Sequence, residues 1–128
     1  MSSHDTLLSP TTVGGLELNN RVVMAPMTRN QSPENIPTDA NVEYYRKRAA
    51  GGVGLIVTEG TCVDHIAASG YPGVPYIYGD DRLAGWKRVI DAVHAEGGKI
   101  APQLWHVGGM RKRGVLPEGD VDGYAPSG

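Results

Sequence analysis

The sequence has 128 residues, 40% of them hydrophobic, which is enough for one modest globular domain. Its formal net charge of −2 argues against nucleic acid or an acidic membrane as partner. The single basic run, Arg111-Lys112-Arg113, is interpreted as a solvated loop. We expect a cytoplasmic protein, because the sequence shows no signal peptide and no apolar run near the roughly 18 residues of a membrane span. With a single cysteine, Cys62, we expect no internal disulfide.

The first predicted elements are a hairpin and a buried strand. Apolar residues on both sides of Gly14-Gly15 predict a β-hairpin over about residues 7–18. The following run is apolar without clean alternation, which is typical of a strand buried on both faces, and predicts a strand over about residues 20–26. The chain then becomes polar at Pro26-Met27-Thr28, and a long loop continues to Pro37.

Two helices and two further strands are predicted next. Helical spacing of apolar residues predicts one helix from Thr38 or Asp39 to Gly51-Gly52 and another from Asp80 or Asp81 to Gly97-Gly98. The expected inner stripe of the second helix consists of Leu83, Trp86, Val89, Ile90 and Val93. Short apolar runs predict strands over about residues 53–59 and about residues 99–104.

This order of elements indicates an α/β protein with parallel strands, because helices of this length join consecutive strands. Two architectures share the signal, the doubly wound sheet and the eight-stranded (β/α)₈ TIM barrel, and the local pattern does not separate them. The turn after the first strand, Pro26-Met27-Thr28-Arg29, lacks the glycine fingerprint of a dinucleotide-binding sheet. That absence favours the barrel.

The candidate functional residues follow the ends of the three predicted strands, where parallel sheets bind ligands. The Gln103 amide has donors and an acceptor that match the mixed edge of a flavin or a nucleobase, and Gly60 permits a planar ligand to approach the backbone closely. An equally weighted alternative is that Gln103 caps its strand while Trp105 and His106 pack under a loop. No metal site is expected, because the nearest pair of potential ligands, Cys62 and His65, is too small a set.

Four segments, taken in order, resemble successive motifs of the Old Yellow Enzyme family. They are Asn20-Arg21-Val22-Val23-Met24-Ala25-Pro26-Met27-Thr28-Arg29, Glu43-Tyr44-Tyr45-Arg46-Lys47-Arg48-Ala49, Gly54-Leu55-Ile56-Val57-Thr58-Glu59-Gly60-Thr61 and Gln103-Leu104-Trp105-His106-Val107-Gly108. The resemblance spans nearly all of residues 7–128. It implies a (β/α)₈ barrel with non-covalent FMN. The implied activity is that of an ene-reductase, which passes hydride from NAD(P)H through FMN to the activated C=C bond of an α,β-unsaturated carbonyl or nitro compound.

The same resemblance implies roles for individual residues. Pro26, Met27 and Thr28 would contact the flavin, with the Thr28 hydroxyl near the flavin O4. Gly60 would lie against the isoalloxazine, although many members have Ala at this place, and Gln103 would bind the pyrimidine edge. Tyr71 and Trp105 would line the substrate side.

The resemblance also implies that the catalytic residues lie elsewhere. The family's proton-donating Tyr and its substrate-anchoring His–Asn or His–His pair come from later strands, so no catalytic residue is expected within residues 1–128. We therefore expect these residues to be the amino-terminal portion of a single FMN-binding barrel domain, with a complementary chain supplying the remaining strands. The alternative is an inactive truncated barrel piece that serves only as a structural or binding partner of another chain.

Overall fold

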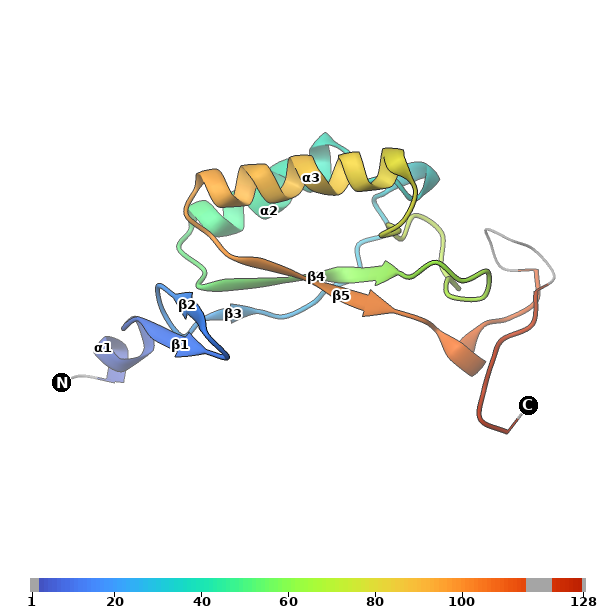
Figure 1. The fold of residues 1–128 in the computed structure, drawn as a ribbon, viewed down its shortest axis with the longest axis horizontal. Helices are drawn as coiled ribbons and strands as arrows, with labels where there is room; N and C mark the ends of the chain where they lie inside the picture. The colour runs from blue at the N-terminus through green and yellow to red at the C-terminus, as the bar shows by residue number, and fades with distance from the viewer. Residues whose placement is uncertain (1–2, 115–120, 128) are drawn as a thin grey trace.

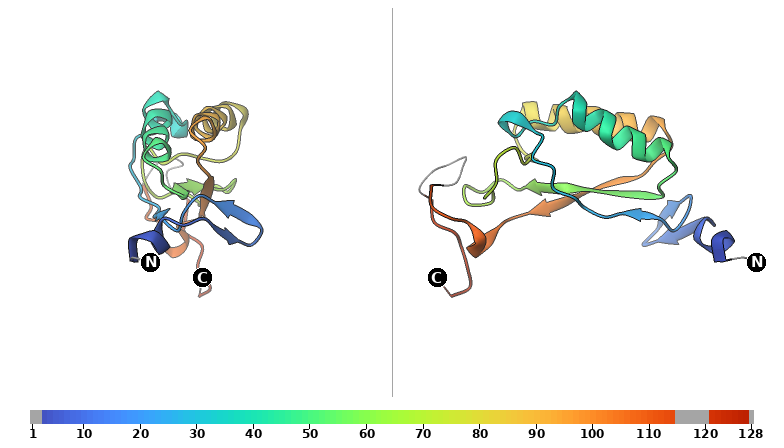
Figure 2. Two further views of the ribbon diagram at one scale, coloured as in Figure 1. Left: turned by 90° about the vertical axis from the view of Figure 1, so that its left-hand side faces the viewer. Right: turned by 180° about the vertical axis from the view of Figure 1, so that it is seen from behind.

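The computed structural model describes residues 3–114 and 121–127, which form two layers (Figure 1). One layer is a three-stranded sheet, and the other consists of helices α2 (Asp39–Ala50) and α3 (Asp80–Ala95). The two helices lie side by side over one face of the sheet, as the end-on view in Figure 2 shows. The opposite face carries no helix in the described part of the chain.

The sheet is parallel, with strand order β3 (Val23–Met24), β4 (Leu55–Cys62) and β5 (Ile100–Trp105). Helix α2 connects β3 to β4, and α3 connects β4 to β5, so the expected α/β arrangement is confirmed. The strand expected over 20–26 is shorter than predicted. The Asn20 side chain bends the entry to β3, accepting from the Val22 N–H at 3.0 Å and donating to the Gly52 carbonyl at 2.7 Å.

The amino-terminal segment differs from the expectation in one respect. The hairpin consists of β1 (Thr11–Val13) and β2 (Leu16–Leu18), and both turn residues, Gly14 and Gly15, have positive φ as a tight two-residue turn requires. It begins later than predicted, because residues Ser3–Leu7 form a short helix, α1. The hairpin lies near the amino ends of the sheet strands, away from the loops at their carboxyl ends (Figure 1).

The core lies between the two helices and the sheet. Its buried members are Tyr45, Ala49, Ile56, Trp86, Val89 and Val93. Helix α2 begins with a capping box, in which the Asn41 side chain accepts the Thr38 N–H at 2.9 Å, so the predicted start is correct.

Only part of the predicted inner stripe of α3 packs against the core. Leu83 and Ile90 are 47% and 38% exposed and face a groove of about 210 Å³ between α3 and β5. Ile100 and Pro102 of β5 form the other wall of this groove. Helix α3 packs towards α2 and β4, which leaves its other apolar side without a partner among the described residues.

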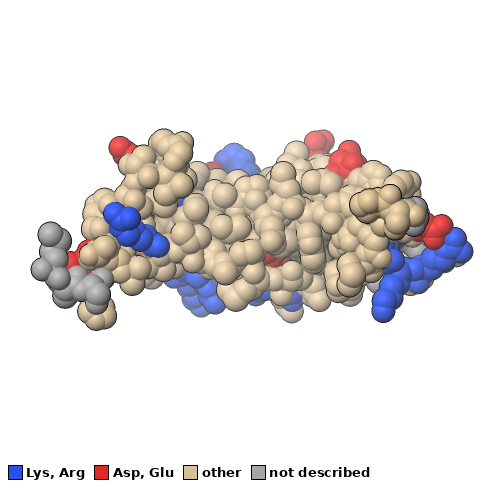
Figure 3. Space-filling model, turned by 90° about the horizontal axis from the view of Figure 1, so that it is seen from below, with Lys and Arg blue, Asp and Glu red and all other residues tan. Residues whose placement is uncertain are grey.

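The sheet face away from the helices is mostly uncharged (Figure 3). No helix in the described ranges is long and apolar enough to span a bilayer.

Candidate functional site

The predicted site residues Gly60 and Gln103 are neighbours across β4 and β5. Their register is offset by a β-bulge, because Val57 pairs with Ala101 whereas Gly60 pairs with Gln103, so β4 has one extra residue. Opposite the extra residue is Pro102, which has no N–H for the ladder. The Gln103 N–H instead donates to the Thr58 hydroxyl at 3.2 Å.

The bulge determines which way the side chains beyond it face. Side chains alternate along a strand, and one extra residue reverses the alternation. Gly60 and Gln103 are thereby brought onto the same sheet face as Val57 and Ala101, and they lie side by side at the carboxyl end of the sheet.

Trp105 covers Gly60. A Cβ atom built on Gly60 would lie 2.3 Å from the indole Cε3 and 2.5 Å from Cδ2, so the ring rests against bare backbone. Tyr71 stacks on the other side, with ring centroids 5.6 Å apart and an interplanar angle of 0°. The structure thus brings together the two aromatic residues that the sequence suggested for the substrate side, and Trp105 packs both on Gly60 and under the loop that follows β4, as the alternative interpretation expected for Trp105. Their contact with a substrate stays a prediction.

The third predicted segment, Pro26-Met27-Thr28, lies beyond the end of β3, and all three residues are exposed. The next residue, Arg29, fixes the position of this segment, because its N–H donates to the Glu59 carboxylate at 3.4 Å. The segment therefore runs beside the end of β4 that carries Gly60.

Glu59 is the most unusual charged group near these strand ends, since it is only 1% exposed. Burial raises the pKa of the Glu59 carboxyl, while hydrogen bonds from Tyr45, Arg29 and Asn41 and the charge of Arg29 act in the opposite direction. Burial also raises the pKa of the Tyr45 phenol well above its usual range, and the neighbouring carboxylate adds to that shift. Sequence reasoning did not single out Glu59, because its partners lie on other elements.

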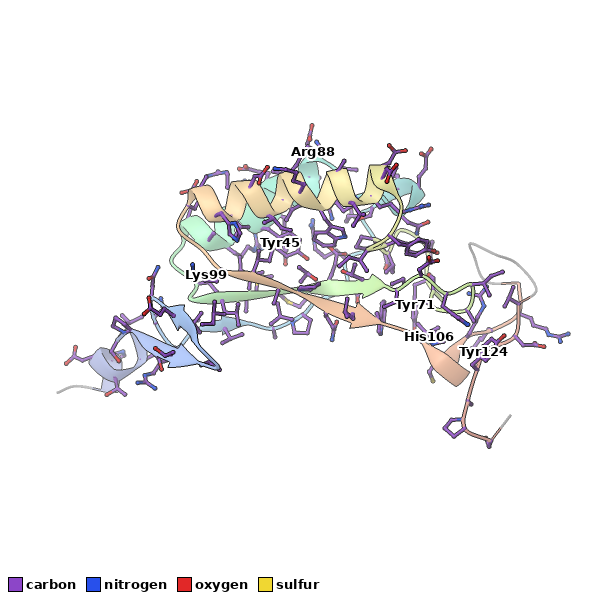
Figure 4. All side chains as sticks on the ribbon, in the orientation of Figure 1. Tyr45, Tyr71, Arg88, Lys99, His106 and Tyr124 are labelled. Carbon is purple, nitrogen blue, oxygen red and sulfur yellow. The ribbon has the colours of Figure 1, made fainter. Side chains whose placement is uncertain are left out.

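Two histidines, one in the loop after β4 and one directly after β5, lie close together at the carboxyl end of the sheet. His106 Nε2 lies 3.0 Å from His65 Nδ1, and Tyr124 meets the His65 ring edge-on, with centroids 5.0 Å apart. The Gly108 N–H donates to His106 Nδ1 and the Ala67 N–H donates to His65 Nδ1, which makes His106 Nε2 the donor of the pair. Figure 4 shows Tyr71, His106 and Tyr124 together at this end.

The side chain of Cys62 contacts the loop that carries His65. Cys62, the predicted neighbour of His65, is buried, and its Sγ donates weakly to the Ala68 carbonyl at 3.8 Å. No group of three potential metal ligands occurs among the described residues.

Arg111 corrects another expectation. It belongs to the basic run that we read as a solvated loop, yet it is 6% exposed. Its guanidinium donates to the carbonyls of Ser69 and Val121, joining the loop after β4 to the carboxyl-terminal segment. Those partners are 42 and 10 residues away along the chain, so no local pattern could have indicated them.

Comparison with known proteins decides the family. The model of the NADH:flavin oxidoreductase / NADH oxidase family matches residues 6–127. The chain belongs to this family, which is that of Old Yellow Enzyme. The predicted family and the (β/α)₈ barrel class are therefore confirmed, as are FMN as the family's cofactor and a nicotinamide as its co-substrate.

Three relatives show how far the similarity to this family extends. Flavin oxidoreductase hxnT of Emericella nidulans is 43% identical over 132 residues, covering 99% of this chain and 33% of the relative. 12-oxophytodienoate reductase 7 of Oryza sativa subsp. japonica is 45% identical over 88% of this chain and 28% of its own length. The structure of morphinone reductase superposes with a TM-score of 0.84 at 43% identity, over 94% of this chain and 32% of that one. The chain thus spans about a third of the length of these relatives.

The donor set of this flavoprotein chain fits a flavin. Gln103 offers an amide with both donors and an acceptor, and Thr28 adds an exposed hydroxyl beyond the end of β3, whereas Gly60 is covered by Trp105. These two groups lie at the carboxyl ends of parallel strands of one sheet, which is where barrels bind their ligands.

Proposed function

We propose that residues 1–128 form the flavin-facing part of an NAD(P)H-dependent ene-reductase. The substrate class is an activated alkene, namely an α,β-unsaturated carbonyl or nitro compound. The observation that carries the proposal is the pairing of Gly60 with Gln103 next to the Trp105–Tyr71 stack. FMN, when bound, supplies the capacity to accept and return a hydride.

The residues of this chain bind and orient rather than react. Pro26, Met27 and Thr28 would hold one side of the flavin, and Gln103 would pair with its pyrimidine edge. Trp105 and Tyr71 would form an aromatic wall that keeps water from the substrate side. The proton donor and the substrate-anchoring pair belong, in this proposal, to other strands of the barrel.

The names of two relatives support the substrate class, because they designate reductases of 12-oxophytodienoate and of morphinone. A single cysteine, Cys62, fits a reducing compartment, which we take to be the cytoplasm.

The proposal requires further strands. In the described part, β3 and β5 each leave one edge unpaired, and the groove beside α3 is apolar. We propose that additional polypeptide, either a continuation of this chain or a complementary chain, closes the barrel. The term "assembled barrel" denotes residues 1–128 together with that polypeptide.

Cofactor retention by Gln103→Ala tests the function. The wild-type assembled barrel should be yellow as purified, and the variant should lose FMN on desalting while its order of preference among alkenes is unchanged. Gln31→Ala, in the exposed loop before α2, is the matched control and should retain FMN. A colourless wild-type barrel that refuses added FMN would overturn the proposal, and a Gln103→Ala variant with full occupancy but altered alkene preference would move Gln103 to the substrate side.

A further inference from the structure

The buried Glu59 carboxyl, on β4, binds both α2 and the segment that follows β3. Its Oε1 accepts from Asn41 Nδ2 at 3.3 Å and from the Tyr45 hydroxyl at 3.2 Å, both on α2. Its Oε2 accepts from the backbone N–H of Arg29, which follows β3. The next residue, Gly60, belongs to the opposite sheet face, where it meets Trp105. Glu59 therefore lies directly behind the residues proposed to face the flavin.

The α2 side of this arrangement is fixed by further hydrogen bonds. Asn41 Nδ2 also donates to the Ser32 hydroxyl at 3.2 Å, and Asn41 Oδ1 accepts from the Thr38 N–H and hydroxyl. The Tyr45 hydroxyl accepts the Glu59 N–H at 2.8 Å, so the tyrosine and the glutamate bind each other twice. Ser32, Asn41 and Tyr45 are 0% exposed. A buried and mutually satisfied network of this kind holds its members in one geometry.

The Arg29 end differs, because the group that Glu59 holds there is backbone. The Arg29 N–H belongs to the peptide unit that joins Thr28 to Arg29, so the bond fixes the plane of that peptide. The Arg29 guanidinium lies 3.6 Å from the centroid of the Tyr44 ring, which anchors the side chain to α2 as well. Residues 26–28 lie beyond β3 and are exposed, so they depend on this anchor for their position.

We propose that Glu59 is a positioning residue that holds Pro26-Met27-Thr28 in place for the flavin. This inference rests on the proposed function. Glu59 acts through the Arg29 amide and touches neither flavin nor substrate, and its rigidity comes from Asn41 and Tyr45 behind it.

The test compares Glu59→Gln with Tyr45→Phe in the assembled barrel. A glutamine side chain has one oxygen where glutamate has two, so in either orientation its NH₂ faces another donor. If the glutamine oxygen accepts from Asn41 and Tyr45, the Arg29 N–H is left without an acceptor. Tyr45→Phe removes a hydroxyl from the same network but keeps the bond from Arg29 to Glu59. We expect Glu59→Gln to weaken FMN binding about tenfold and to change the visible flavin spectrum, the typical scale for losing one anchored hydrogen bond. We expect Tyr45→Phe to lower the unfolding temperature while leaving FMN affinity within about twofold.

Equal loss of FMN affinity in the two variants, or none in Glu59→Gln, would overturn the inference. Hydrogen exchange on the wild-type barrel provides a second test that does not depend on a variant's folding. The Arg29 amide should be protected to the level of the β4 amides, and exchange as fast as that of exposed Gln31 would overturn the inference. A wild-type barrel that does not bind FMN would instead overturn the proposed function itself, and this inference with it.

Discussion

At the scale of single residues, the contact between Gly60 and Trp105 leaves no room for a side chain. The clash that a Cβ would make is with the rigid indole rather than with the flexible end of a side chain. The Trp105 ring can therefore occupy this position, and stack on Tyr71, only because residue 60 has no side chain.

Gly60→Ala is expected to displace Trp105 and break its stack with Tyr71. The near-UV circular dichroism of the assembled barrel should change, and KM for the alkene should change more than KM for the nicotinamide, because the stack is proposed to line the alkene site. Gly51→Ala is the control, since its Cβ would meet backbone oxygens at an acceptable 3.4 Å and lies at the far end of α2. An unchanged dichroism spectrum in Gly60→Ala would contradict the packing described here.

Thr28→Ala tests the third strand end. If its hydroxyl donates near the flavin O4, losing a bond of about 1–2 kcal/mol should lower the two-electron reduction potential by tens of millivolts. Reduction by the nicotinamide should slow, whereas reoxidation by the alkene should not. Equilibration with reference dyes gives the potential, and a value equal to that of the wild type would remove Thr28 from the site.

At the scale of elements, the outer surface of α2 carries an ion-pair cluster that also reaches α3. Arg46 contacts Glu43 at 2.8 Å and Glu96, just after α3, at 2.6 Å. Hydrogen bonding to Arg46, with a smaller contribution from Lys47, lowers the pKa of Glu43 to about 2. Because the Glu43 carboxylate is exposed, we expect salt to screen much of this effect.

The sign of the resulting pH dependence follows from the lowered pKa. Glu43 contributes stability above its unfolded value of 4.5, and this contribution is lost as the pH falls towards about 2. Glu43→Gln should therefore reduce the fall in unfolding temperature over that interval at low salt and have little effect in 0.5 M NaCl. Glu17→Gln, on exposed β2, is the control. A Glu43→Gln profile parallel to the wild type at low salt would show that the ion pair makes no contribution.

Elements defined by local signals were predictable from the sequence. The capping box at Thr38 and Asn41 and the apolar spacing of Trp86, Val89 and Val93 lie within single segments, and these helices form as expected. The β-bulge was missed, although Pro102 inside a strand was a usable sign of it. The environment of Glu59 was not predictable, because its partners Arg29 and Tyr45 lie 30 and 14 residues away and meet it only in the folded sheet.

At the scale of the whole molecule, the groove beside α3 distinguishes a completed barrel from an isolated two-layer unit. Leu83, Ile90 and Pro102 are apolar and exposed in the described part of the chain. In a (β/α)₈ barrel, the next strand and helix would lie on this side.

Ile90→Ala measures whether the groove is covered. In the assembled barrel, we expect the substitution to lower the free energy of unfolding by about 2–4 kcal/mol, the range for a buried isoleucine. Ala84→Ser, on the exposed side of the same helix, should change it by less than about 0.5 kcal/mol. A small effect at Ile90 would mean that solvent still reaches this side of α3 after assembly. Denaturant unfolding followed by circular dichroism gives both values.

The β-bulge also restricts how this part of the chain can vary in length over evolution. Between Val57 and Gly60, β4 has one residue more than β5 has between Ala101 and Gln103, and the bulge accommodates it. Deleting Glu59 would remove the bulge and leave Gly60 opposite Gln103, but it would also remove the buried carboxylate that binds α2 and the segment after β3. A single-residue insertion at this place would shift Gly60 out of register with Gln103. Related sequences should therefore show an unbroken alignment from Val57 to Cys62.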